Sequence, residues 1–227
     1  MLSWRSAASA GPATAGDVRG CFLVVSGPDG TGKSTFVDAL VATVHEAPVI
    51  RYHHRIGFLP RRAASLVPVD RPHATKAYPR WLSRIKVLYL FGDYLVGTAF
   101  RVRPALRRGS WVVLERGWWD IAVDPRRYRL SAGDGLAARL GRILPRPDLQ
   151  IVLEAPSETI IKRKAELERD ELERQVVRWR LIARAEPQGL ILDSRRSPED
   201  LVRMALVALG RPGTGPDRRV GTPDAAR

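Results

Sequence analysis

Short runs of apolar residues alternate along this chain with longer segments in which apolar residues recur every three to four positions. The runs are bounded by polar residues, glycine or proline, which is typical of strands buried on both faces of a sheet. The predicted strands lie at 21–26, 48–52, 110–115, 148–154 and 189–193. The amphipathic spacing of the intervening segments predicts helices. The predicted helices lie at 34–44, 75–108, 136–144, 157–185 and 198–209.

This alternation predicts an α/β fold of three layers, in which helices cover both faces of a parallel sheet. Ligands of such sheets bind at the carboxyl ends of the strands, so residues that follow strands are the first candidates for function. The segment 116–134 follows a strand, carries aromatic and charged residues, and is predicted to be a functional loop. We expect one domain over 20–210, a disordered leader at 1–19 and a disordered tail at 211–227.

Composition narrows the class of protein. The 227 residues are 44% hydrophobic and 27% charged, ordinary values for a globular domain. The longest nearly apolar run, 87–100, is shorter than the roughly 20 residues that a membrane span needs. Cys21 is the single cysteine, which excludes an internal disulfide and fits a small core residue in a buried strand. We therefore expect a cytoplasmic protein with no membrane segment.

The charge balance is strongly basic, with 38 lysines and arginines against 24 acidic residues and a net charge of +14. Only five of the basic residues are lysine, and the arginines are spread along the whole chain without a nucleic-acid-binding motif. This distribution indicates a compositional bias more than a binding stripe. We expect small polyanions such as nucleotides, and not nucleic acid, as the main partners.

One glycine-rich motif carries specific chemistry. It fits the pattern G-x-x-x-x-G-K-[ST] of a P-loop (Walker A), and it stands between a predicted strand and a predicted helix. Its glycines let backbone N–H groups turn toward phosphate oxygens, Lys33 adds charge at the β- and γ-phosphates, and Ser34 can ligate Mg²⁺. We expect Lys33 to lie in an exposed loop. The predicted nucleotide-binding residues are Gly27, Pro28, Asp29, Gly30, Thr31, Gly32, Lys33, Ser34 and Thr35.

A P-loop predicts nucleotide binding without fixing the reaction. The chain is short for a motor or helicase, and it has no guanine-reading Asn-Lys-x-Asp motif. The charge density of 157–185 is typical of a lid over a phosphate site, with the lid itself expected near 157–175. These features favour a small kinase.

The chain resembles the thymidylate kinase family of nucleoside monophosphate kinases over most of residues 21–209. The resemblance rests on the P-loop, on Val-Leu-Glu-Arg at 113–116, on Pro-Asp-Leu-Gln-Ile-Val-Leu-Glu at 147–154 followed by Arg163, and on Leu-Asp at 192–193. It implies an ATP-dependent kinase that uses Mg²⁺. It also implies a homodimer.

Four departures from the family pattern lie where the acceptor is expected to bind. Arg-Tyr-His-His-Arg at 51–55 replaces the usual Arg-Glu-Pro-Gly-Gly, and Glu115 with Gly117 replaces an aspartate and an aromatic residue. Asp93-Tyr94 replaces an Asp-Arg pair, and Trp-Trp-Asp at 118–120 lacks the expected serine and glutamine. We therefore expect thymidylate to be a poor acceptor or none.

The predicted catalytic residues are Lys33, Glu115, Arg116 and Arg163. Glu115 ends a strand and could hold Mg²⁺ together with Ser34, orient the acceptor, or only cap Arg116. Arg116 could grip an anionic acceptor group, since guanidinium makes two-point contacts with such groups, or form a salt bridge to Glu115 or Asp120. The P-loop has no arginine, so a lid arginine, Arg163 by family position, is expected at the transferred phosphoryl group.

The function predicted from these residues is transfer of the ATP γ-phosphoryl group to a nucleoside monophosphate. Two alternatives stay open at this point. One is a kinase of the same fold acting on a sugar or sugar phosphate, and the other is a nucleotide-binding protein without catalysis.

Overall fold

A computed structural model describes residues 20–58, 77–131, 134–163 and 169–211 of the chain. The leader predicted at 1–19 and nearly all of the tail predicted at 211–227 lie outside these residues.

The centre of the molecule is a five-stranded parallel sheet in the order β2-β3-β1-β4-β5. The strands are β1 (Cys21–Ser26), β2 (Val49–His53), β3 (Trp111–Glu115), β4 (Leu149–Glu154) and β5 (Gly189–Asp193). Each lies within one residue of its predicted bounds. The central strands β1, β3 and β4 could be recognised because their residues are apolar at nearly every position, as burial on both faces requires. The edge strand β2 is only half-buried and mixes apolar with polar residues.

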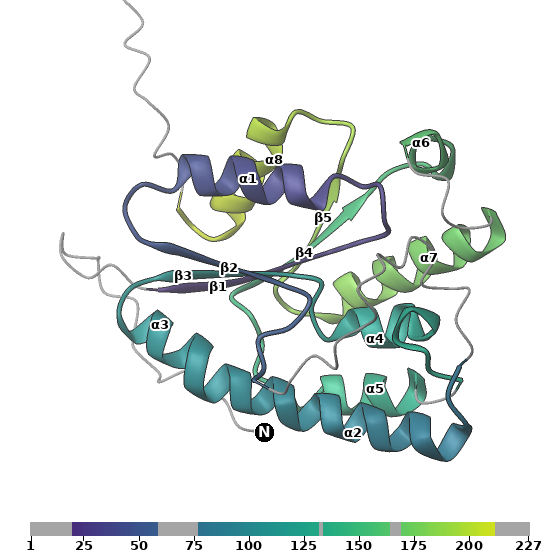
Figure 1. Ribbon diagram of the computed structural model, residues 1–227. Coiled ribbons are helices and arrows are strands. Elements are labelled where there is room, and N and C mark those ends of the chain that lie inside the picture. Colours follow the sequence, from purple (N-terminus) through teal and green to yellow (C-terminus); the bar gives the residue numbers. More distant parts are fainter. Residues whose placement is uncertain (1–19, 59–76, 132–133, 164–168, 212–227) are drawn as a thin grey trace, which may run out of the picture.

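Helices cover both faces of the sheet, so the predicted three-layer α/β fold of the P-loop NTPase type is confirmed (Figure 1). The helices are α1 (Lys33–Thr43), α2 (Arg80–Gly97), α3 (Arg103–Arg107), α4 (Trp119–Val123), α5 (Asp134–Gly141), α6 (Ser157–Arg163), α7 (Arg169–Ala185) and α8 (Pro198–Ala208). A π-helical turn, Thr98–Val102, joins α2 to α3. The helix predicted to begin at residue 75 begins five residues later, after Pro79.

Strand β1 shows how alternate side chains fill two separate cores. Cys21, Leu23 and Val25 pack with α1 and α8 on one face, whereas Phe22 and Val24 pack with α3 and the loop after β2 on the other. Cys21 is therefore the buried core residue that the sequence predicts. Within the described part of the chain, no helix is both long enough and apolar enough to cross a membrane.

The prediction of a loop over 116–134 is wrong. The segment contains α4 and a 3₁₀ turn, Pro125–Tyr128, whose first residue follows the capping carboxylate of Asp124. Trp118 and Ile121 are buried against α2 and α5, so this segment is packed structure rather than an open loop.

Candidate active site

The P-loop connects β1 to α1 in the way its motif predicts. Gly27 has φ +137°, and a side chain there would overlap the carbonyl oxygen of Leu153 on β4. Gly32, in the left-handed conformation with φ +78°, precedes the first turn of α1. The loop therefore presents backbone N–H groups and the positive end of the α1 dipole at the carboxyl edge of the sheet, which is a favourable place for phosphate.

Lys33 is buried, so the prediction that it lies in an exposed loop is wrong. It is the first residue of α1, and its Nζ donates hydrogen bonds to the carbonyl oxygens of Gly27 (2.8 Å) and Pro28 (2.7 Å). Burial, helped by the charge of Arg116 and opposed by that of Asp29, lowers the pKa of Lys33 to about 8. The ammonium group is thus held at the loop but is less strongly protonated than a free lysine.

Ser34 and Glu115 come together as the sequence predicts for a metal site. The Ser34 hydroxyl donates a hydrogen bond to Glu115 Oε2 over 3.1 Å, because β3 is the neighbour of β1 in the sheet. Glu115 also accepts a hydrogen bond from Arg51, and His53 Nδ1 lies 3.3 Å from it. A hydroxyl and a carboxylate beside a phosphate site are the oxygen ligands that suit Mg²⁺, which takes its remaining ligands from water and substrate phosphates.

Arg116 is held in a left-handed conformation (φ +61°) by a hydrogen bond from its backbone N–H to the carbonyl oxygen of Val25. Its guanidinium forms an ion pair with Asp29 of the P-loop. Its Nη1 also forms, over 3.9 Å, the salt bridge to Asp120 that the sequence predicts as one alternative. The structure therefore places Arg116 at the P-loop carboxylate, a contact that neither sequence alternative includes.

Arg127 belongs to the same cluster, and sequence reasoning missed it. It lies on the 3₁₀ turn after α4, and its Nη1 contacts Asp29 Oδ2 over 2.6 Å. The local signal was the Asp124-Pro125 start of this turn, whose Asp124 side chain accepts a hydrogen bond from the Arg127 backbone N–H. Although burial alone would raise it, the charges of Lys33, Arg116 and Arg127 hold the pKa of Asp29 far below its usual range.

Asp120 is another buried carboxylate of this region. Burial outweighs the nearby positive charges and raises the pKa of Asp120 to about 6. One of its oxygens, Oδ2, has no hydrogen-bond partner. Asp120 also lines a small pocket together with P-loop residues, Arg116, Arg127, and Gln175 and Trp179 of α7.

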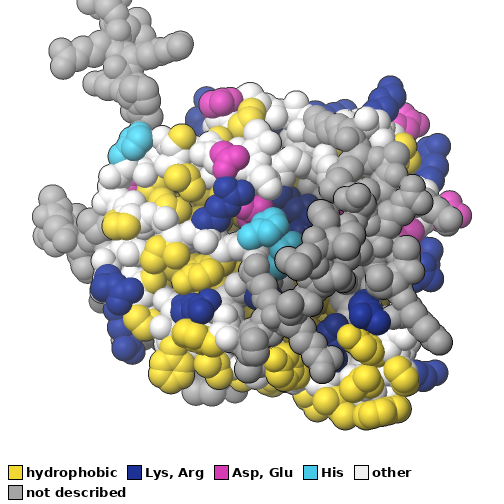
Figure 2. All heavy atoms as spheres, in the orientation of Figure 1, with side chains coloured by type: hydrophobic (Ala, Val, Ile, Leu, Met, Phe, Trp, Pro, Cys, Tyr) yellow, Lys and Arg dark blue, Asp and Glu magenta, His cyan; other side chains and the backbone are white. Residues whose placement is uncertain are grey.

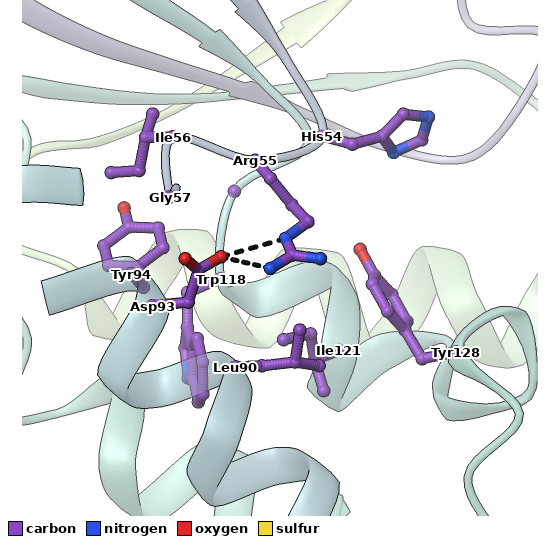
Figure 3. Close-up of a pocket in the computed structure, with 11 residues that line it drawn as sticks. His54, Arg55, Ile56, Gly57, Leu90, Asp93, Tyr94, Trp118, Ile121 and Tyr128 are labelled. Atoms are coloured by element: carbon purple, nitrogen blue, oxygen red, sulfur yellow. Dashed lines mark hydrogen bonds and ion pairs between the residues drawn. The ribbon is translucent and has the colours of Figure 1, made fainter. Parts of the chain in front are cut away.

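A second pocket lies next to this cluster (Figure 3). Arg55, from the loop after β2, reaches into it and donates hydrogen bonds to Asp93 of α2. Apolar and aromatic side chains form much of the remaining wall: Leu90, Tyr94, Trp118, Ile121 and Tyr128. A cation in a partly aromatic hollow suits an anionic or polar molecule that carries a ring.

Trp118 lines this pocket and also packs α4 against its neighbouring helices. Its Nε1 donates a hydrogen bond to the carbonyl oxygen of Ala137 over 2.8 Å, and its ring packs edge-on against Phe91 and Tyr94. The indole is thus an anchor of α4 against α2 and α5.

The segment predicted to be a lid contains two helices, α6 and α7, and residues 164–168 between them lie outside the described part. Arg163 is the last residue of α6, and its side chain is outside the description as well. Arg169 and Arg174 are exposed. Arg169 pairs with Glu173 of its own helix and with Glu158 of α6, and Arg174 pairs with Glu171. For these two arginines the pairing fits a solvated helix face.

The fold and this site define a class. A parallel sheet with a P-loop after β1, and a carboxylate at the end of the adjacent β3 that contacts the P-loop serine, is a P-loop nucleotide-binding domain.

Comparison with known proteins identifies the family within this class. The chain is 30% identical over 215 residues to a thymidylate kinase of Methylococcus capsulatus, covering 82% of this chain and 93% of that protein. A thymidylate kinase of Pseudomonas putida is also 30% identical, over 83% of this chain and 95% of its own. One of Methylobacillus flagellatus is 26% identical over 86% and 98%. No family model matches the chain. The chain belongs to the thymidylate kinase family and is a kinase.

Proposed function

We propose that this kinase binds ATP with Mg²⁺ and transfers the γ-phosphoryl group to a nucleoside monophosphate. The observation that carries the proposal is the adjacency of a complete P-loop to a pocket with arginine and aromatic walls, in a chain related to thymidylate kinases over more than four-fifths of its length. Neither a sugar kinase nor a non-catalytic protein is favoured by these relatives.

On the donor side, Lys33 and the P-loop N–H groups bind the ATP phosphates. Lys33 reaches those phosphates by leaving the carbonyl oxygens of Gly27 and Pro28, which it contacts now. Ser34 and Glu115 would hold Mg²⁺, and the ion would supply positive charge to the ATP phosphates. Arg51 bridges Glu115 and Asp38 and so fixes the carboxylate at the edge of the sheet.

On the acceptor side, the body of the nucleotide occupies the pocket around Arg55 (Figure 3). The loop with Arg55 is pressed closely onto α2, since a side chain at Gly57 would overlap Asp93 and one at Gly97 would overlap the Ile56 carbonyl. The relatives are named thymidylate kinases. Because this region departs from the family pattern, we expect thymidylate to be a poor acceptor of this kinase, or not an acceptor at all.

The helices α6 and α7 act as the lid of the single domain 20–210. Gln175 and Trp179 of α7 already line the pocket beside the P-loop, and α6, which ends at Arg163, packs against α7. Closure of this lid over bound ATP would bring Arg163 toward the transferred group and exclude water.

The exposed face of α2 supports a homodimer. Large apolar side chains on this helix are exposed at helical spacing, and Figure 2 shows hydrophobic side chains gathered along the edge where α2 lies. They include Trp81, Ile85, Leu88, Tyr89 and Val96. An apolar helix face of this size in a globular protein is a common protein–protein interface.

The acceptor is tested by a screen of ADP release with ATP and Mg²⁺ across nucleoside monophosphates, sugars and sugar phosphates. The proposal predicts stimulation by at least one nucleoside monophosphate and abolition of that stimulation in Lys33→Ala. Stimulation by sugars alone would contradict it.

A further inference from the structure

Three cationic side chains converge on one carboxylate beside the P-loop. Arg116 Nη2 pairs with Asp29 Oδ1, Arg127 Nη1 pairs with Asp29 Oδ2 at 2.6 Å, and Lys33 Nζ lies 3.5 Å from Oδ1. The Asp29 and Arg116 side chains are about nine-tenths buried. Asp120 also contacts this cluster, since its Oδ1 lies 3.9 Å from Arg116 Nη1.

The arrangement suits an anion that has more oxygens than a carboxylate. Two guanidinium groups each engage a separate oxygen of one anion, as arginines do around phosphate. In addition, Arg116 Nε is buried and has no hydrogen-bond partner. A buried donor without an acceptor is costly, and a phosphate group, with three terminal oxygens, could satisfy it where a carboxylate does not.

The location of Arg127 relates this anion site to the acceptor pocket. Arg116, Asp120 and Arg127 line the small pocket at the P-loop. Their immediate neighbours in sequence, Gly117, Ile121 and Tyr128, line the larger pocket with Arg55. The same segment thus forms one wall of both pockets, and the cluster lies between the larger pocket and the P-loop.

We propose that Arg127, together with Arg116, binds the phosphate of the acceptor, and that the Asp29 carboxylate holds this position while the site is empty. This inference rests on the proposed function and extends it. A phosphate monoester is the class of acceptor that suits this site, because its terminal oxygens can accept from the unpartnered Arg116 Nε and from Arg127 together. Arg127 binds the acceptor phosphate through its planar guanidinium group, whereas Lys33 binds the phosphates of ATP.

The test compares Arg127→Gln with Arg126→Gln, a neighbouring exposed arginine on the same turn. Each variant is loaded with Mg²⁺ and a non-hydrolysable ATP analogue, and inorganic phosphate is titrated calorimetrically as the probe of the acceptor site. We expect the phosphate affinity of Arg127→Gln to fall roughly 10- to 150-fold, the loss of one charge-assisted hydrogen bond. Arg126→Gln should stay within about twofold of the original protein, and ATP-analogue affinity should not change in either.

A second variant, Arg127→Lys, keeps the positive charge and so separates an effect on phosphate binding from an effect on folding. It should melt like the original protein and still bind phosphate more weakly, because the two-point contact is lost. Equal phosphate affinity in Arg127→Gln and Arg126→Gln would overturn the inference. So would a wild-type protein, loaded with the ATP analogue, that binds no phosphate. Because this titration needs no turnover, it is separate from the screen: a protein that binds phosphate through Arg127 but phosphorylates no nucleoside monophosphate would contradict the proposed function alone.

Discussion

At the scale of single residues, the site contains buried charged groups whose pKa values are shifted by burial and by neighbouring charges. Lys33 is buried with its ammonium on two carbonyl oxygens, and Asp29 stays ionised because three cations surround it. His54 is half-buried, and burial together with the charge of Arg116 lowers its pKa to about 3, so it is neutral near pH 7. The nucleotide-free site thus carries positive charge that phosphate groups can neutralise.

The lowered pKa of Lys33 predicts how ATP binding depends on pH. Below about pH 8 the free protein already has a charged Lys33, so its ATP affinity should be level. Above pH 8 the lysine must take up a proton when ATP binds, because phosphate favours its charged form. The association constant should then fall by up to about tenfold per pH unit.

Calorimetry between pH 7 and 10 measures this slope, and buffers of different ionisation enthalpy report the proton uptake directly. Lys33→Arg is the control, since arginine stays charged throughout this range and should show no such slope. A level affinity to pH 10 in the original protein would contradict a pKa near 8.

Arg116→Lys tests the separation of donor and acceptor sides. Lysine keeps the charge but loses the planar fork, so kcat/KM for the acceptor should fall by roughly 10- to 150-fold, the effect of one charged hydrogen bond. ATP affinity, measured without acceptor, should barely change. An equal loss of ATP binding would assign Arg116 to the donor side, and a melting temperature lower by several degrees with both functions impaired would assign it to the fold.

At the scale of helices and strands, the parts that the sequence predicts well are those in which local pattern and burial agree. The central strands β1, β3 and β4 are apolar along nearly their whole length, and the P-loop motif has a fixed spacing of its own. The segment 116–134 was mistaken for a loop because its helix is only five residues long and is held by contacts with α2 and α5. Such contacts leave no local periodicity.

The charged cluster was less predictable for a similar reason. Asp29 and Arg127 lie 98 positions apart in the chain and meet only because α4 and its 3₁₀ turn pack beside the P-loop. The pairing of Ser34 with Glu115, 81 positions apart, could be anticipated, because both follow adjacent strands of one parallel sheet. Sequence reasoning therefore placed the strand-end residues and missed those on the segment packed beyond them.

The close packing of the Arg55 loop on α2 gives a prediction at this scale. In Gly97→Ala the new methyl group would overlap the Ile56 carbonyl, so the loop must shift. We expect a loss of about 1–3 kcal/mol in the free energy of unfolding, the usual cost of overpacking, and a raised KM for the acceptor.

The matched control is Gly135→Ala in α5, where an added methyl group meets open space. That variant should be unchanged or up to about 1 kcal/mol more stable, since alanine is the better helix former. Chemical denaturation measures both, and equal stability of the two variants would show that the loop does not depend on this contact.

At the scale of the whole molecule, the proposed dimer follows from the apolar face of α2. Ile85→Glu combined with Leu88→Glu places two charges on this face without touching the described core, since both side chains are more than half exposed. Sedimentation should show the original protein as a dimer and the variant as a monomer of unchanged melting behaviour or slightly reduced stability. A monomeric original protein would exclude this interface.

The central claim is that a nucleoside monophosphate receives the γ-phosphoryl group of ATP, and the most direct measurement identifies the product. ATP labelled in the γ-phosphate is incubated with Mg²⁺, the protein and each nucleoside monophosphate, and the labelled products are separated. The account predicts a labelled nucleoside diphosphate with the original protein and none with Lys33→Ala. Label released only as inorganic phosphate, or a diphosphate formed equally well by Lys33→Ala, would contradict it.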